Sequence, residues 1–65
     1  MKQELISKRI KEILANNGWT LTELAYKMDA DLASASRWVN GKQNMTIKTI
    51  ERMEYTLGEE IISVL

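Results

Sequence analysis

The 65-residue sequence contains no cysteine and no histidine. Without cysteine there can be neither disulfide bonds nor thiolate metal ligands, so an apolar core must hold the fold. Without histidine the chain lacks the most frequent metal ligand and general base. Glycine-rich phosphate loops and nucleophile motifs are also missing, and the carboxylates have no partner at a fixed spacing. We therefore expect no enzyme, no metal site and no cofactor.

Proline is absent as well, and the three glycines stand singly at positions 18, 41 and 58. Isolated glycines are typical of helix ends, where they adopt the left-handed backbone conformation. Hydrophobic residues make up 45% of the chain, which is enough for one small core. The sequence predicts an all-α fold with a single domain over residues 1–65, either a whole protein or a piece cut from a slightly longer chain.

Excess charge and long apolar runs are also lacking. Nine basic and nine acidic residues give a formal net charge of zero, so the charge balance alone does not indicate nucleic acid. No apolar run approaches the length of a membrane span, and the first residues do not form a secretory signal. We expect a soluble, cytoplasmic protein with no membrane partner.

Hydrophobic spacing and capping residues predict the first two helices. A helix over about residues 3–17 is indicated by an apolar stripe of Ile6, Ile10, Ile13 and Leu14. A second helix, over about residues 21–28, begins at a capping box formed by Thr20 and Glu23.

Three further helices follow. Asp29 tolerates the left-handed conformation in the turn, and Asp31 is a good N-cap for a helix over about residues 32–40. Thr46 caps a fourth helix that ends before residue 58. Residues 59–65 are predicted to form a short fifth helix with an acidic first turn.

The third predicted helix has an outward face of unusual composition. Ala33, Arg37 and Asn40 share this face and are flanked by Ser36, whereas Trp38 points inward. Small side chains let a helix enter a major groove deeply, and arginine can pair with the O6 and N7 atoms of guanine. All charges between residues 32 and 50 are positive. This pattern indicates a DNA-reading helix, with an ordinary solvated surface as the alternative.

The sequence from Arg9 to Leu57 resembles the helix-turn-helix domains of the phage repressor and Cro-like family, also called the xenobiotic-response-element (XRE) family. The pair Leu24-Ala25 and residues 36–42 are its most specific parts. The matching segments are Arg9-Ile-Lys-Glu-Ile13, Gly18-Trp-Thr-Leu-Thr-Glu-Leu-Ala25, Ser36-Arg-Trp-Val-Asn-Gly-Lys42, Asn44, Thr49-Ile-Glu-Arg-Met53 and Leu57-Gly58. The resemblance implies a compact five-helix, lambda-repressor-like domain whose second and third helices form the helix-turn-helix.

The resemblance also implies roles at matching positions, with phosphate contacts positioning the domain and base contacts specifying sequence. The residues that would face base edges are Leu32, Ala33, Ser36 and Arg37. Those that would contact the DNA backbone are Thr20, Leu21 and Thr22 at a helix start, and Asn40, Lys42, Gln43 and Asn44 after the reading helix. For Leu32 there are two interpretations: contact with a thymine methyl group, or closure of a gap over Met28.

The chain departs from the family pattern in three ways. Asp29 stands where the family usually has glycine in the turn. Leu14 and Val39 replace a buried arginine and glutamate of many members, an exchange that is often neutral or stabilising. Asp29 and Asp31 also place carboxylates where a phosphate would run, although Asp31 is occupied if it caps the helix.

We conclude from the sequence that the chain is a sequence-specific regulator of transcription, a repressor that binds a palindromic operator in double-stranded DNA as a homodimer. The alternative is an antitoxin or another protein-interaction module with the same fold and a toxin or other protein partner. The apolar residues 61–65 either pack on the core, form a dimer interface, or mark a cut in a longer chain.

Overall fold

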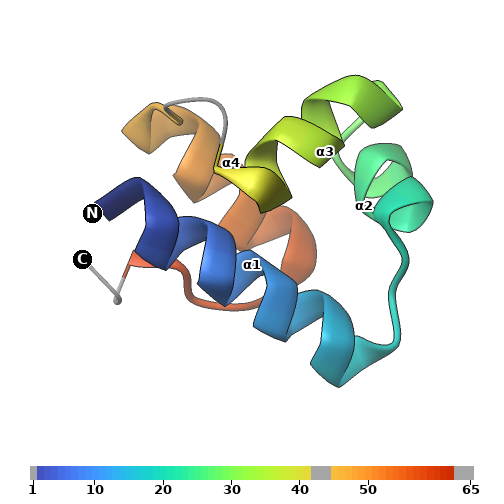
Figure 1. Cartoon of the computed structure of the whole chain (residues 1–65), viewed down its shortest axis with the longest axis horizontal. Helices are drawn as coiled ribbons and strands as arrows, with labels where there is room; N and C mark the ends of the chain where they lie inside the picture. The colour runs from blue at the N-terminus through green and yellow to red at the C-terminus, as the bar shows by residue number, and fades with distance from the viewer. Residues whose placement is uncertain (1, 42–44, 63–65) are drawn as a thin grey trace.

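The computed structural model describes residues 2–41 and 45–62, and this part contains four α-helices (Figure 1). Helix α1 spans Lys2–Asn17, α2 Leu21–Lys27, α3 Leu32–Asn40 and α4 Ile47–Leu57. Helix α3 packs against both α1 and α2. None of the described helices is both long and apolar enough to cross a membrane.

The helix starts follow the predicted capping signals. In the capping box of α2, the Thr20 amide donates to Glu23 Oε1 at 2.9 Å and the Glu23 amide donates to Thr20 Oγ1 at 3.2 Å. The Ser34 amide donates to Asp31 Oδ1 at 2.7 Å at the start of α3, and Thr46 caps α4 in the same way. These bonds satisfy amides that have no partner inside their helices.

The turn between α2 and α3 is closed by a left-handed aspartate. Asp29 has a φ of +52°, as the sequence predicts, and is the one non-glycine residue with positive φ in the described part of the chain. Its amide donates to the carbonyl of Tyr26, and the Ala30 amide donates to that of Ala25. These two bonds end α2 and set the direction in which α3 leaves the turn.

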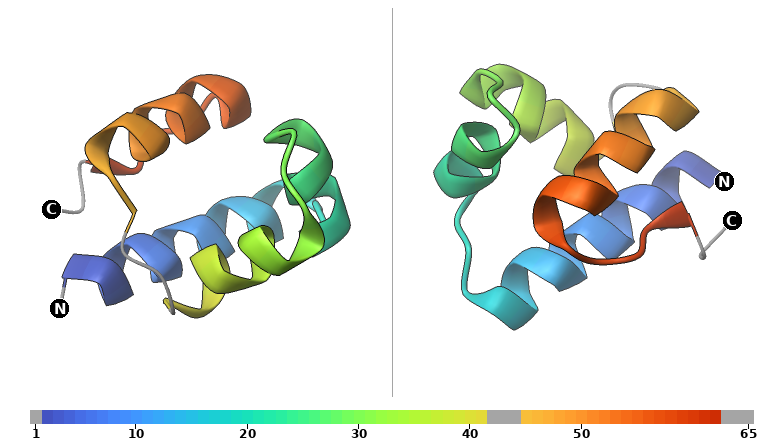
Figure 2. Two further views of the ribbon diagram at one scale, coloured as in Figure 1. Left: turned by 90° about the horizontal axis from the view of Figure 1, so that it is seen from above. Right: turned by 180° about the vertical axis from the view of Figure 1, so that it is seen from behind.

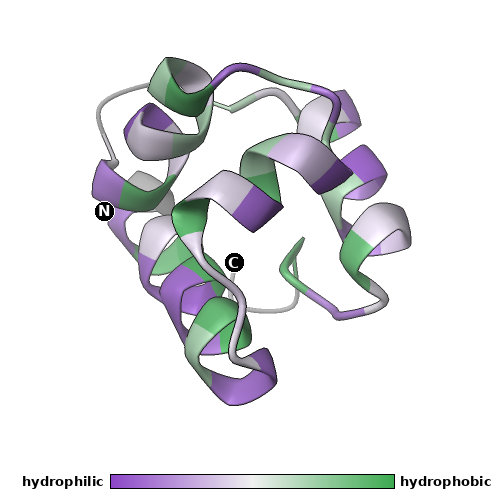
Figure 3. Ribbon diagram, turned by 90° about the vertical axis from the view of Figure 1, so that its right-hand side faces the viewer, coloured by the Kyte–Doolittle hydropathy of each residue, from purple (hydrophilic) through white to green (hydrophobic). Residues whose placement is uncertain are grey.

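The core lies between the four helices, where the apolar faces in Figure 3 are turned inward. Its buried members include the pair that replaces the family's arginine and glutamate, Leu14 and Val39. The buried apolar residues are Ile6, Ile10, Ile13, Leu14, Leu24, Ala25, Met28, Ala35, Trp38, Val39, Ile50, Met53, Leu57 and Ile61. Trp19 and Met45 are partly buried against this core.

Among the described residues, Ser7 is the one polar side chain that is buried. Its Oγ donates to the carbonyl oxygen of Trp38 at 2.9 Å, which links α1 to the last turn of α3. A methyl group on Gly41 would lie 3.2 Å from the Ser7 hydroxyl oxygen, so the two helices approach closely here. The contact fixes the far end of α3 on α1.

The prediction of a fifth helix is wrong for the residues that the structure describes. The chain after Gly58 runs without α-helical structure through Ile61, and residues 63–65 lie outside the described part. Ile61 is fully buried, which contributes on the order of 1.5–3 kcal/mol to stability. Its amide and that of Ile62 donate to one carboxylate oxygen of Glu54, at 2.6 and 2.8 Å.

Residues 59–62, which we call the C-terminal strap, are also held by α1. Arg9 Nε donates to the carbonyl of Glu60 at 2.8 Å, and the guanidinium group lies 3.7 Å from a carboxylate oxygen of Glu59. These contacts and the burial of Ile61 hold the strap against the core and α1 in place of a further α-helix.

Candidate nucleic-acid interface

The outward face of α3 carries the residues that the sequence predicts to read bases. Leu32, Ala33 and Arg37 are exposed and Ser36 is partly exposed. Ala35, Trp38 and Val39 are buried against α1 and α2, so the packing of the opposite face decides which residues of α3 reach solvent. The residues predicted to contact bases therefore share one accessible surface.

Two hydrogen bonds hold this face in order. Arg37 Nη2 donates to Ser34 Oγ at 3.3 Å, one turn earlier on α3. Asn40 Nδ2 donates to Ser36 Oγ at 3.2 Å. Side chains that the resemblance assigns to DNA therefore bond to hydroxyls of their own helix when DNA is absent, and a binding partner must exchange with or add to these bonds.

Asp31 is tied into the same network. Hydrogen bonds from the side chain and amide of Ser34, together with the nearby charge of Arg37, hold the pKa of this carboxyl below its usual value. The carboxylate thus caps α3, as the sequence predicts. Asp29 is exposed in the turn and remains the acidic group that a passing phosphate would meet there.

Leu32 is about half exposed, with 52% of its surface accessible. It does not belong to the side chains that pack on the core, although Met28 beneath is fully buried. This exposure speaks against closure of a gap over Met28, and contact of Leu32 with a thymine methyl group stays a prediction. Arg52 donates a hydrogen bond to the Met28 carbonyl.

The start of α2 provides backbone amides. The Thr20 and Glu23 amides are used by the capping box, whereas those of Leu21 and Thr22 belong to the first turn and have no partner within the helix. Thr20 and Thr22 are exposed, and Leu21 is partly buried against the core. Such amides suit an anion.

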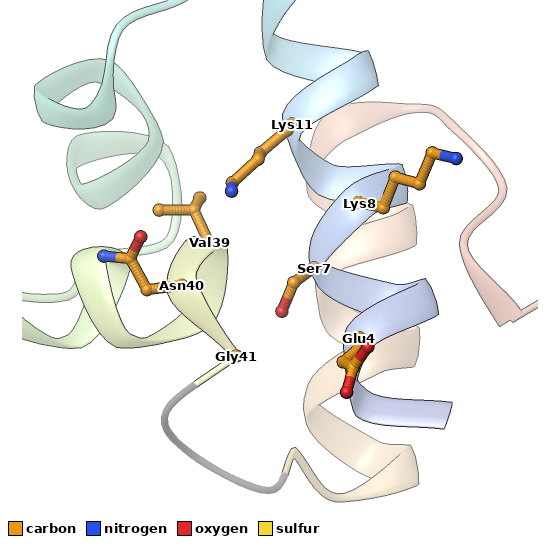
Figure 4. A pocket seen from close by; sticks show the side chains of 7 residues that line it. All are labelled: Glu4, Ser7, Lys8, Lys11, Val39, Asn40 and Gly41. Carbon is orange, nitrogen blue, oxygen red and sulfur yellow. The ribbon is translucent and has the colours of Figure 1, made fainter. Parts of the chain in front are cut away.

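The end of α3 provides the other predicted backbone contacts. Asn40 is exposed on the last turn. Lys42, Gln43 and Asn44, which the sequence also predicts to contact DNA, lie outside the described residues. Beside Asn40 there is an open hollow of about 450 Å³ between α1 and α3, shown in Figure 4.

Comparison with known proteins identifies the family. The family model of the Cro/C1-type HTH DNA-binding domain matches residues 9–61, which include all of α2, α3 and α4 and most of α1. The chain belongs to this family. No curated protein and no solved structure matched it. The resemblance found in the sequence is therefore confirmed, and the exposed α3 belongs to a Cro/C1-type DNA-binding domain.

Sequence reasoning missed several residues that shape this Cro/C1-type domain. Ser34 was not assigned a role, although it lies one turn before Arg37 on α3. Ser7 lies three residues before Ile10 and seven before Leu14, within the apolar stripe of α1, and a small polar residue in such a place indicates a close helix contact. No local signal points to the bonds of Arg9 and Glu54 with the C-terminal strap, because they join residues from different parts of the chain.

Carboxylates do not gather into a metal site in the described part of the chain, where no group of three or more potential ligands could hold an ion.

Proposed function

We propose that this protein is a sequence-specific regulator of transcription that binds double-stranded DNA in the cytoplasm by placing α3 in the major groove. The observation that carries the proposal is the exposed face of α3, which is formed by small side chains and ends in Arg37, within a Cro/C1-type domain. Each further step follows from the chemistry of that face.

Small side chains determine how deeply α3 can enter a groove. An α-helix with its side chains is about 10–12 Å wide and a major groove is about 12 Å wide. Ala33 and Ser36 keep the outward side of α3 narrow in its first two turns. Base edges can then come within reach of short side chains, so that Ser36 can bond to a base and Leu32 can contact a thymine methyl group.

Arg37 supplies the strongest base contact in this proposal. A guanidinium group has five N–H donors in a planar fork, and in Arg37 one of its nitrogens donates to Ser34 Oγ. In the complex this fork can form a bidentate pair with O6 and N7 of guanine in exchange for contacts within the protein. The serine bond then limits the side chain to few conformations before DNA arrives.

Phosphate contacts would position the domain without reading sequence. We assign them to residues 20–22 at the start of α2, where the amides of Leu21 and Thr22 have no partner within the helix, and to Asn40, Lys42, Gln43 and Asn44 after the reading helix. With about 3–5 phosphates contacted per protomer, the affinity should fall with salt concentration with a log–log slope of roughly −3 to −4.5.

A homodimer on a palindromic operator completes the proposal. The end of the described chain lies on the same side of the molecule as the start of α1 in Figures 1 and 2. Leu5 on α1 and Ile62 in the strap are exposed there, at 47% and 38%. Apolar side chains at this end suit contact with a second copy, and two copies would read two half-sites. Such a dimer represses by occupying the operator.

Selection from random duplexes tests the function. The expected result is an enriched palindrome with a preferred guanine in each half-site. The same selection with Arg37→Ala should no longer prefer guanine at that position. If no sequence is enriched, the regulator is rejected in favour of the protein-interaction alternative, in which an antitoxin-like domain uses this face for a toxin or another protein.

A further inference from the structure

Most of the positive side chains in the described part of the chain form a hydrogen bond, an ion pair or a ring contact within the protein. Arg9 is paired with Glu12 and Glu59, and Lys27 lies over the ring of Trp19 with its Nζ 4.4 Å from the centroid. Arg37 and Arg52 also bond within the protein. The described lysines without a bond or ion pair are Lys8, Lys11 and Lys48.

Two of these lysines lie on α1 at the hollow beside the end of α3. The residues that line the hollow are Glu4, Ser7, Lys8, Lys11, Val39, Asn40 and Gly41. Figure 4 shows that Lys11 extends across it toward Val39 and the last turn of α3, whereas the ammonium group of Lys8 points away. The positive charge of Lys11 therefore lies at the hollow, and that of Lys8 is directed away from it.

The charge in the hollow is divided along α1. Glu4 lies seven residues before Lys11, which is about 10 Å along a helix at 1.5 Å per residue. Ser7 lies between them, and its hydroxyl hydrogen is directed to the Trp38 carbonyl. The end near Lys11 is thus positive, and the end near Glu4 is negative. The Asn40 amide is directed away from Lys11 in Figure 4, and its Nδ2 donates to Ser36 Oγ. An anion fits only the end near Lys11.

The position of this end relative to α3 indicates which anion. A major groove is only slightly wider than a helix, so phosphates of the DNA backbone run close beside a helix that fills it. Lys11 points to the last turn of α3, where Asn40 is exposed. A phosphate that passes Asn40 would come within reach of an ammonium group on a flexible four-carbon stem.

We propose that Lys11 binds a phosphate at the end of the hollow next to the last turn of α3 and so grips the DNA backbone flanking the reading helix. The site rests on the proposed function and extends it to α1, which would then contact DNA in addition to supporting the fold. It strengthens binding to every sequence alike, since it touches no base. In a chain of zero net charge, one such cation matters more than it would in a basic protein.

The test compares Lys11→Ala with Lys8→Ala, which removes the same charge from the same helix but from a side chain that points away. Affinity for the selected duplex and for a random duplex is measured at several salt concentrations. Lys11→Ala should make the log–log slope less negative by about 0.9 per protomer, since one phosphate contact is lost. It should lower the affinity for both duplexes by the same factor. Lys8→Ala should keep the wild-type slope, and Lys11→Arg should restore it.

A second measurement locates the contact on the DNA. Single phosphates of the selected duplex are replaced by neutral methylphosphonates, one position at a time. At one position per half-site, the replacement should lower the affinity of the wild-type protein several-fold and leave the affinity of Lys11→Ala unchanged. If Lys11→Ala responds to every replacement as the wild type does, or shares the slope of Lys8→Ala, the site is rejected. A wild-type protein that binds no duplex would instead reject the proposed function itself.

Discussion

Arg37 is the long cation on the outward face of α3, and its environment is set by the residue one turn before it. Ser34 bonds to the guanidinium group through Oγ and to Asp31 through its amide. The three residues are spaced by three positions and follow one side of the helix. Ser34 is therefore a positioning residue, and Arg37 is the residue that would touch the base.

This arrangement predicts different results for two substitutions. Arg37→Ala should cost roughly 1–3 kcal/mol on the selected site and relax the preference at one base pair. Ser34→Ala keeps the amide that donates to Asp31 but removes the hydroxyl that bonds to Asp31 and Arg37, and it should cost about 0.5–1.5 kcal/mol at the same base pair. Binding to single-base variants of the site measures both.

The double variant separates positioning from direct contact. When Arg37 is already alanine, Ser34→Ala should have no further effect, because the group that it positions is gone. Additive losses would mean that Ser34 contacts DNA independently. Uniform weakening over all sequences would mean that Arg37 binds phosphate instead of a base.

At the scale of elements, the positions of α1 and α3 depend on the close contact between Ser7 and Gly41. Gly41 and Gly58 end their helices with nearly equal φ values, +67° and +71°. They differ in surroundings, since an added methyl would meet Ser7 Oγ at Gly41 and open space at Gly58. The two glycines therefore form a matched pair.

Alanine at both positions should show this difference. In each variant, an alanine in the left-handed conformation should lower the free energy of unfolding by about 1–2 kcal/mol. Gly41→Ala should lose more stability than Gly58→Ala, because Ser7 must move as well, and should also weaken DNA binding through the displaced end of α3. Denaturant unfolding gives the comparison, and equal losses would show that the helix contact adjusts without strain.

The C-terminal strap depends on one carboxylate of α4. Hydrogen bonds from the amides of Ile61 and Ile62 hold the pKa of Glu54 below its ordinary value of 4.5. A lowered pKa in the folded state contributes stability above the ordinary value, and this contribution is lost as the pH falls through the lowered pKa. The strap should therefore loosen in acid, at pH values below the usual glutamate range.

Glu54→Gln measures this contribution. The variant should have a lower Tm than the wild type at pH 7, and the difference should shrink as the pH falls below 4.5, because the wild-type carboxylate becomes neutral. Glu51→Gln, exposed on the same helix, is the control. A constant difference between Glu54→Gln and wild type at all pH values would contradict the assignment.

The helix ends could be predicted and the strap could not, for one physical reason. A cap joins residues three positions apart, as Asp31 and Ser34 do, so the local sequence contains both partners. The acceptor of the Ile61 amide is seven residues earlier on another element, and the Arg9 contact spans 51 residues. The acidic start of residues 59–65 looked like a helix start because these partners were not known.

At the scale of the whole molecule, one domain presents a single reading helix, so occupancy of a palindrome depends on two copies. Leu5→Glu places a charge on the apolar surface to which we assign exposed Leu5 and Ile62, and it should shift the protein toward monomer in sedimentation. Operator affinity should then fall, while the affinity for an isolated half-site stays unchanged. A wild-type protein that is monomeric at all concentrations and binds half-sites and palindromes alike would contradict the dimer.

The sequence by itself determined the four helices, their caps, the left-handed Asp29 and the membership of the Cro/C1-type family. These depend on spacings of one to four residues and on motifs that lie within short segments. Only the tertiary structure decided which cations are used within the protein and which remain available, because their partners are distant in sequence. In the tertiary structure Arg9 holds the C-terminal strap on α1, and Lys11 lies beside the end of α3.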